Sequence, residues 1–199
     1  MKNAKKVIVL ALCAILLVAA SVMGTLAYLT STATVQNTFT AGNVTITMVE
    51  SDVDEYGKNP NGTANANEYK LVPGHTYTKD PTITVGADSE DCYIFVKIEN
   101  GLGNAATIVM DTTNWTLVNG TLSGTSVWVY GTATNAVAVT KNSKVTPFST
   151  FTFGANANPA DYVTASNENA KIAVTAYAIQ ADTLDSKTPA DIWALFNVQ

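Results

Sequence analysis

Arginine is absent from this sequence, and the eleven lysines are scattered along the chain. Proteins that bind nucleic acid neutralise phosphates with clusters of arginine and lysine, and no such basic stripe occurs here. The sixteen acidic residues leave a net charge of −5, which is typical of a soluble, self-repelling surface. We therefore expect no nucleic-acid partner.

Histidine occurs once, as His75 in the turn-like stretch VPGHTY. A zinc site of the His-Glu-x-x-His type needs two imidazoles one helical turn apart, so the chain cannot build one. The sequence also lacks a Gly-x-Ser-x-Gly nucleophile elbow and a glycine-rich phosphate loop. We expect a protein that is not an enzyme, with no catalytic residue, no cofactor and no recognised metal site. His75 is interpreted as a structural or exposed turn residue.

Cysteine occurs twice, as Cys13 in an apolar N-terminal run and as Cys92 in DCYIFVKIE. Loss of the N-terminal run would leave one thiol and no intramolecular disulfide. A domain of this length is large enough to be held together by its apolar core. Alternation places Cys92 on one strand face with Ile94, Val96 and Ile98, which favours a small buried apolar side chain. A reactive or bridging thiol is the alternative.

The N-terminus has the pattern of a secretory signal. Lysines at positions 2, 5 and 6 precede residues 7–24, which contain no charge. Retention as a membrane anchor is the alternative, and membrane contact is expected only through the uncleaved signal. The small residues of Thr25-Leu26-Ala27 predict cleavage between Ala27 and Tyr28. The exported chain then carries eight lysines against sixteen acidic residues, a net charge of −8.

Most of the chain after residue 30 reads as β-strands. Thr, Val, Ala, Tyr and Ile dominate, and Asn, Gly, Asp and Pro punctuate them, which predicts a β-sandwich or barrel. Pro81 marks a sheet edge or a strand entry. The apolar runs 92–99 and 171–181 are expected to be central strands. The further strands are expected at 44–49, 77–85, 114–118, 126–130, 136–140 and 148–153.

Helix signals are few. Thr188-Pro189-Ala190-Asp191 supplies an N-cap, a proline at the first helical position and an acidic residue in the first turn. Ile192, Trp193, Leu195 and Phe196 then form an apolar stripe, so we expect a short C-terminal helix that caps one open end of the sandwich. Residues 104–111 are a candidate for a second short helix. Residues 51–67 and 155–169 read as surface loops.

The acidic loop begins like an EF-hand, with Asp52 and Asp54 two residues apart and Gly57 at the sixth position. Tyr56 replaces an oxygen ligand, Thr63 replaces the bidentate glutamate, and no helices flank the loop, which excludes an EF-hand. A looser calcium site in this loop, or at Asp88, Glu90 and Asp91, remains the alternative to a solvated turn.

Two stretches near the N-terminus, 24–30 (GTLAYLT) and 37–42 (NTFTAG), resemble the signature of the TasA/camelysin family. The similarity to the family sequence continues in three later stretches, namely Leu71-Val72-Pro73-Gly74, Lys79-Asp80-Pro81 and the strand 89–98. The resemblance implies an exported protein of Gram-positive bacteria whose signal is cut by a SipW-type signal peptidase. It further implies a jelly-roll β-sandwich that forms biofilm matrix fibres by donor-strand complementation. Camelysins are described as metalloproteases, but the residues for a recognised zinc site are absent here.

This resemblance and the residue patterns together predict three parts. Residues 1–27 are a signal peptide that forms a helix, 28–42 a candidate donor strand with its lead-in, and 43–199 a jelly-roll-like antiparallel β-sandwich ending in the short C-terminal helix. The assembly strand is expected to comprise Tyr28, Leu29, Ser31, Ala33 and Val35.

Alternation from residue 28 places a weakly apolar face opposite a polar one made of Thr30, Thr32, Thr34, Gln36 and Thr38. Such a strand pairs equally well in its own sheet or in a neighbour's. The leading hypothesis is a secreted structural fibre subunit at the cell surface or in the extracellular matrix, whose partners are copies of itself or related subunits. A camelysin-like metalloprotease and a surface adhesion module with loop 51–67 at its contact site are the alternatives.

Overall fold

The computed structural model describes residues 43–60, 62, 67–162 and 171–196. These residues belong to the compact unit 41–199, so the expected signal helix and the residues 28–42 lie outside the described part. Short 3₁₀ turns occupy Gly103–Ala105 (η1) and Pro159–Asp161 (η2), and the helix α2 spans Pro189–Phe196. The strands are β1 (Ile46–Val49), β2 (Thr76–Thr78), β3 (Thr82–Val85), β4 (Cys92–Asn100), β5 (Ala106–Met110), β6 (Trp115–Gly120), β7 (Thr125–Tyr130), β8 (Lys144–Val145), β9 (Phe148–Phe153) and β10 (Ile172–Gln180).

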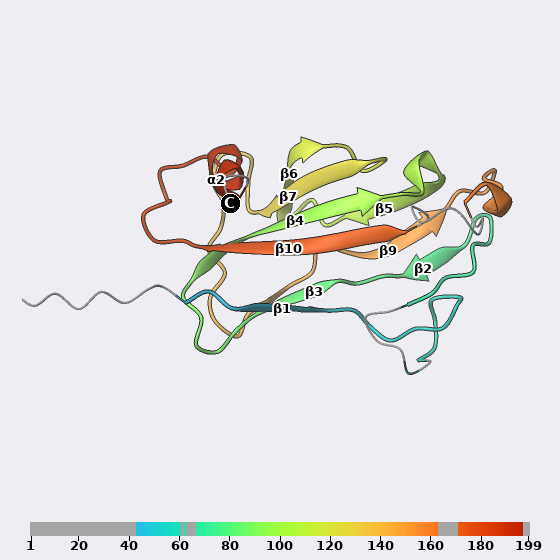
Figure 1. Cartoon of the computed structure of the whole chain (residues 1–199), viewed down its shortest axis with the longest axis horizontal. Helices are drawn as coiled ribbons and strands as arrows, with labels where there is room; N and C mark the ends of the chain where they lie inside the picture. Colours follow the sequence, from blue (N-terminus) through green and yellow to red (C-terminus); the bar gives the residue numbers. More distant parts are fainter. Residues whose placement is uncertain (1–42, 61, 63–66, 163–170, 197–199) are drawn as a thin grey trace, which may run out of the picture. The chain divides into compact units, whose positions relative to one another are not determined.

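The described strands pair antiparallel in two layers (Figure 1). One layer is the four-stranded sheet β10-β4-β7-β6. The other consists of the sheets β1-β3-β8 and β2-β9-β5, which follow one another because β2 leads into β3 and β8 leads into β9. Pro81 and Pro147 lie at the two junctions, where a residue without an N–H cannot continue the ladder. The predicted antiparallel β-sandwich is confirmed.

The main core lies between the two layers. Alternate residues of β4, among them Ile94, Val96 and Ile98, face Ile83 and Phe151 of the opposite layer and are fully or almost fully buried. Cys92 belongs to the same face and has no exposed surface, which confirms its interpretation as a buried apolar side chain. Each large apolar side chain buried in this way stabilises the fold by about 1.5–3 kcal/mol.

The helix α2 covers the outer face of the four-stranded sheet. The expectation that it caps an open end of the sandwich was wrong. Trp193 of α2 packs on Phe95 and Tyr177, with ring centroids 5.8 and 5.0 Å apart. The predicted cap is confirmed, because Thr188 Oγ1 donates to Asp191 Oδ2 at 2.7 Å and accepts from the Asp191 N–H at 3.3 Å. Leu195, predicted in the apolar stripe, points to solvent with 38% of its surface exposed.

Three other expectations were wrong. Residues 136–140 form no strand and make only the isolated bridges of Ala136 with Gly131 and of Val139 with Cys92. Residues 106–110 form β5 rather than a helix, because their β-branched residues alternate between the core and solvent. The run 171–181 is an edge strand, since β10 pairs with β4 alone among the described strands.

Candidate functional site

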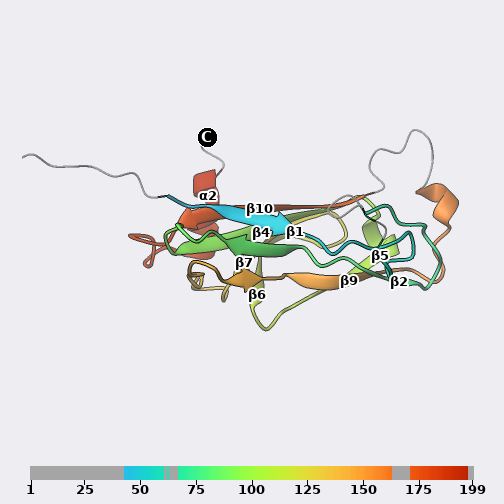
Figure 2. The same cartoon turned by 90° about the horizontal axis from the view of Figure 1, so that it is seen from below.

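Two edge strands, one from each layer, run along the same side of the sandwich (Figures 1 and 2). On β1 and just before it, Val44, Ile46 and Met48 pack against the main core while remaining only half-buried. On β10, the half-buried core contacts are Ile172, Val174, Ala176 and Ala178. We call these seven residues the open flank. Their side chains reach the core, but the elements that the structure describes do not fully cover them.

The main chain of β10 presents unpaired groups at the open flank. Gly101 N–H donates to Lys171 O, and Ala181 N–H donates to Asp91 O, both at 2.9 Å. The register between these two bonds is unbroken, so the odd-numbered residues of β10 bond to β4. The N–H and C=O groups of residues 172, 174, 176 and 178 therefore point away from β4.

The main chain of β1 follows the same rule. Gly86 N–H donates to Thr45 O at 2.8 Å, and the register of β1 with β3 is continuous. The main-chain groups of Ile46 and Met48 thus face away from β3, toward the open flank. In both layers, the outward-facing N–H and C=O groups at this flank can therefore pair with one further strand.

The open flank lacks the features that usually protect a sheet edge. Neither β1 nor β10 contains a charged residue, a proline or a bulge. The edge strands at the other side differ, because β5 and β6 carry register shifts at Ile108/Met110 and Leu117/Asn119. Bulges of this kind twist an edge and interrupt its hydrogen-bond pattern.

The edge of β2 is covered by the acidic loop. Thr78 N–H donates to Gly57 O, and His75 Nε2 lies 2.9 Å from the carbonyl oxygen of Tyr56. Gly57 has φ = +70°, and a Cβ there would lie 2.9 Å from the amide nitrogen of Thr78. This position therefore requires glycine for the close approach. His75 is a turn residue, as predicted, and its ring packs against Tyr77 with centroids 4.6 Å apart.

The acidic residues considered for calcium do not form a cluster of oxygen ligands in the described part of the chain. Asp54 accepts hydrogen bonds from the N–H groups of Tyr56 and Lys58 and from Asn59 Nδ2, each at 3.0 Å. These donors, the Lys58 N–H above all, lower the pKa of Asp54 below its usual value of 3.8. Among the described residues, no three side chains of the His, Cys, Asp or Glu type gather closely enough to hold a metal.

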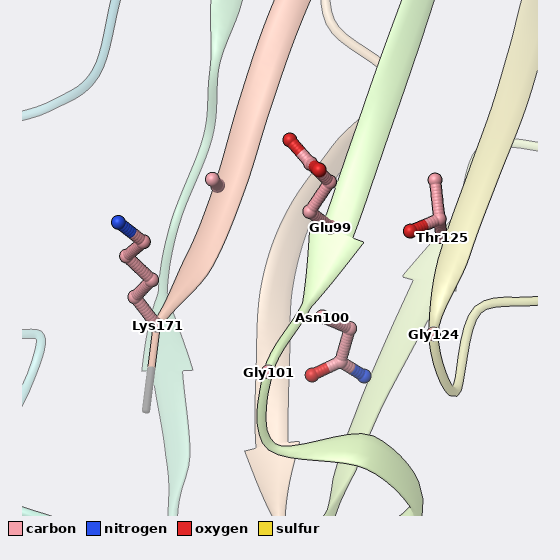
Figure 3. A pocket seen from close by; sticks show the side chains of 7 residues that line it. Glu99, Asn100, Gly101, Gly124, Thr125 and Lys171 are labelled. Atoms are coloured by element: carbon pink, nitrogen blue, oxygen red, sulfur yellow. The ribbon is translucent and has the colours of Figure 1, made fainter. Parts of the chain in front are cut away.

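A hollow of about 440 Å³ lies where β4, β7 and β10 meet their loops. Glu99, Thr125 and Lys171 line it, and the Asn100 side chain points the opposite way from the Glu99 carboxylate (Figure 3). Glu99 is paired with Lys97 at 3.0 Å, while the Asn100 amide donates to Leu122 O at 2.7 Å and to Gly103 O at 3.0 Å. The charged and polar groups of this hollow therefore do not converge on one point, and it lacks a nucleophile–base pair.

The thiol of Cys92 is not poised for chemistry. Burial, with a smaller contribution from Asp91, raises its pKa to about 11. The helix α2 is too short to cross a bilayer, and none of the other described residues forms a membrane-spanning helix.

The sequence-predicted cleavage site at Ala27 and Tyr28, and the assembly strand with Leu29, Ser31, Ala33 and Val35, lie outside the described residues. Sequence reasoning did not identify the open flank, because β10 had been expected at the centre of a sheet. The one available signal was the absence of charge from 172–180 and 44–49. Comparisons of the chain with protein-family models, curated proteins and solved structures find no match.

Proposed function

We propose that this protein is a secreted, non-enzymatic subunit of an extracellular matrix fibre. A SipW-type signal peptidase releases the segment that begins at Tyr28, and this segment of one copy then pairs with the open flank of the next. The observation that carries the proposal is the open flank itself, where uncharged, regular strand edges border a half-covered core.

The chemistry of residues 28–39 matches the open flank. The alternating face that includes Leu29, Ala33 and Val35 can pack on the half-buried apolar side chains of the open flank, while the threonines of the other face remain in water. Twelve extended residues span about 40 Å, which exceeds the roughly 30 Å of the nine-residue β10. The pairing is head to tail, so it extends into a filament unless it closes into a ring.

The test is a deletion of residues 28–35 from the exported protein. We expect the shortened protein to fold, with unchanged far-UV circular dichroism, and to remain monomeric in analytical ultracentrifugation. Negative-stain microscopy should show filaments only for the full-length exported protein.

Filaments of normal length from the shortened protein would refute the proposal. A full-length exported protein that remains monomeric but binds cells or glycans would instead favour a surface adhesion module. N-terminal sequencing of the same sample establishes that cleavage has produced Tyr28.

A further inference from the structure

The outer face of the layer formed by β1-β3-β8 and β2-β9-β5 consists largely of threonine, and we call it the threonine face. Register places Thr47 beside Thr84, and Thr152 between Thr76 and Thr107. The hydroxyls of Thr76 and Thr152 lie 2.8 Å apart and form a hydrogen bond across the two strands. None of the described helices covers this face, whereas α2 covers the outer face of the other layer.

Charge is unusually scarce on the threonine face. Glu99 is the one carboxylate within the described strands, and it lies in the other layer. Asp80, between β2 and β3, accepts hydrogen bonds from Ser51 N and Ser51 Oγ at 2.8 and 2.6 Å. Lys144 is the single charged residue in the strands of this layer. Because the strands of this layer contain no carboxylate, two copies of this acidic protein can meet at this face with little charge repulsion.

Two large apolar side chains also point outward from this layer. Val109 of β5 is 65% exposed and Val49 of β1 is 50% exposed, and they are the most exposed large hydrophobic residues in the described part of the chain. Together with the threonine methyl groups, they give the face apolar contact area without charge. Uncharged sheet faces with such apolar contact area can pack sheet on sheet.

The area of the face determines which association it supports. The rows 76–85 and 144–153 are each about 33 Å long, whereas β1 and β5 are only about 13 and 17 Å long, so at a strand spacing of about 4.8 Å the face measures roughly 450 Å² per copy. Stable protein interfaces bury about 800 Å² per partner, so two isolated copies are not held together by this face alone. Repetition of the contact along two filaments multiplies it, because each further contact is then intramolecular.

We propose that the threonine face is a lateral contact through which a filament of this protein pairs with a second filament, face against the same face. This inference rests on the proposed fibre function. It assigns end-to-end growth to the open flank and side-by-side bundling to a different surface.

The test introduces negative charge on β5, on the opposite side of the layer from the open flank. The double variant Thr107→Glu/Val109→Glu alters two exposed side chains of the threonine face. The matched control, Thr121→Glu/Ser123→Glu, adds the same charge in the exposed turn between β6 and β7. Negative-stain microscopy then measures filament length and the fraction of filaments that lie paired.

We expect wild type and control to form paired filaments, and the β5 variant to form single filaments of normal length. Raising the salt concentration should restore part of the pairing, because it screens the added charge. Wild-type filaments that never pair, or a β5 variant that pairs as often as the control, would overturn the inference while leaving the proposed function intact. Absence of wild-type filaments would refute the proposed function and this inference with it.

Discussion

Single carboxylates hold two of the described turns and the start of α2 in place by accepting hydrogen bonds from N–H and O–H groups. Asp54 organises the turn that precedes Gly57, Asp111 accepts from Asn114 Nδ2 at 2.7 Å, and Asp191 accepts from Thr188. In each case the hydrogen bonds favour the ionised form and lower the pKa of the carboxyl group. The acidic residues thus act as local structural elements in addition to making the surface negative.

The lowered pKa of Asp54 predicts an acid-sensitive loop. A carboxyl group whose pKa is lower in the folded state stabilises that state fully above its unfolded pKa, and this contribution disappears as the pH falls through the folded pKa. The turn 54–59 should therefore be closed at neutral pH, and it should open progressively as the pH falls below 3.8 and through the lowered pKa of Asp54. Amide hydrogen exchange at Lys58, corrected for intrinsic rates, measures the opening. Asp54→Asn should remove most of the pH dependence, and an unchanged profile in that variant would contradict the assignment.

At the scale of elements, alternation predicted most strands but not their position in a sheet. The run 171–181 is apolar on both faces, which is usual for a central strand, yet β10 is an edge strand. One face contacts the main core through Val174, and the other lies under α2 through Tyr177. The helix that covers the second face follows β10 closely in the sequence. The place of β10 in the sheet depends instead on its pairing with β4, which lies far away along the chain. For the same reason the open flank could not be located from the sequence.

The packing of α2 predicts unequal costs for two substitutions within it. Ile192 is 1% exposed beneath the helix, whereas Leu195 is 38% exposed on its other side. Ile192→Ala should lower the free energy of unfolding by about 2–5 kcal/mol, because it leaves a cavity against the sheet. Leu195→Ala should change it by about 0.5 kcal/mol or less. Urea denaturation followed by tryptophan fluorescence measures both, and equal losses would show that α2 does not pack as described.

At the scale of the whole molecule, the proposed filament growth would use main-chain groups of β10 that the fold itself does not use. The N–H groups of odd residues in β10 bond to β4, and those of even residues face the open flank. A proline removes one N–H donor and is tolerated at a sheet edge only where that donor is not already bonded within the sheet. Substitution along β10 can therefore separate assembly from stability.

Ala176→Pro removes a donor that faces the open flank, while Thr175→Pro removes a donor that bonds to β4. We expect the Ala176→Pro protein to keep its fold, with a urea midpoint near that of wild type, and to lose filaments or form only short ones. The Thr175→Pro protein should unfold at lower urea concentration, because it breaks the ladder with β4. Met48→Pro applies the same change to β1, so comparison with Ala176→Pro identifies which edge receives the incoming strand. Normal filaments from both Ala176→Pro and Met48→Pro would exclude the open flank as the site of growth.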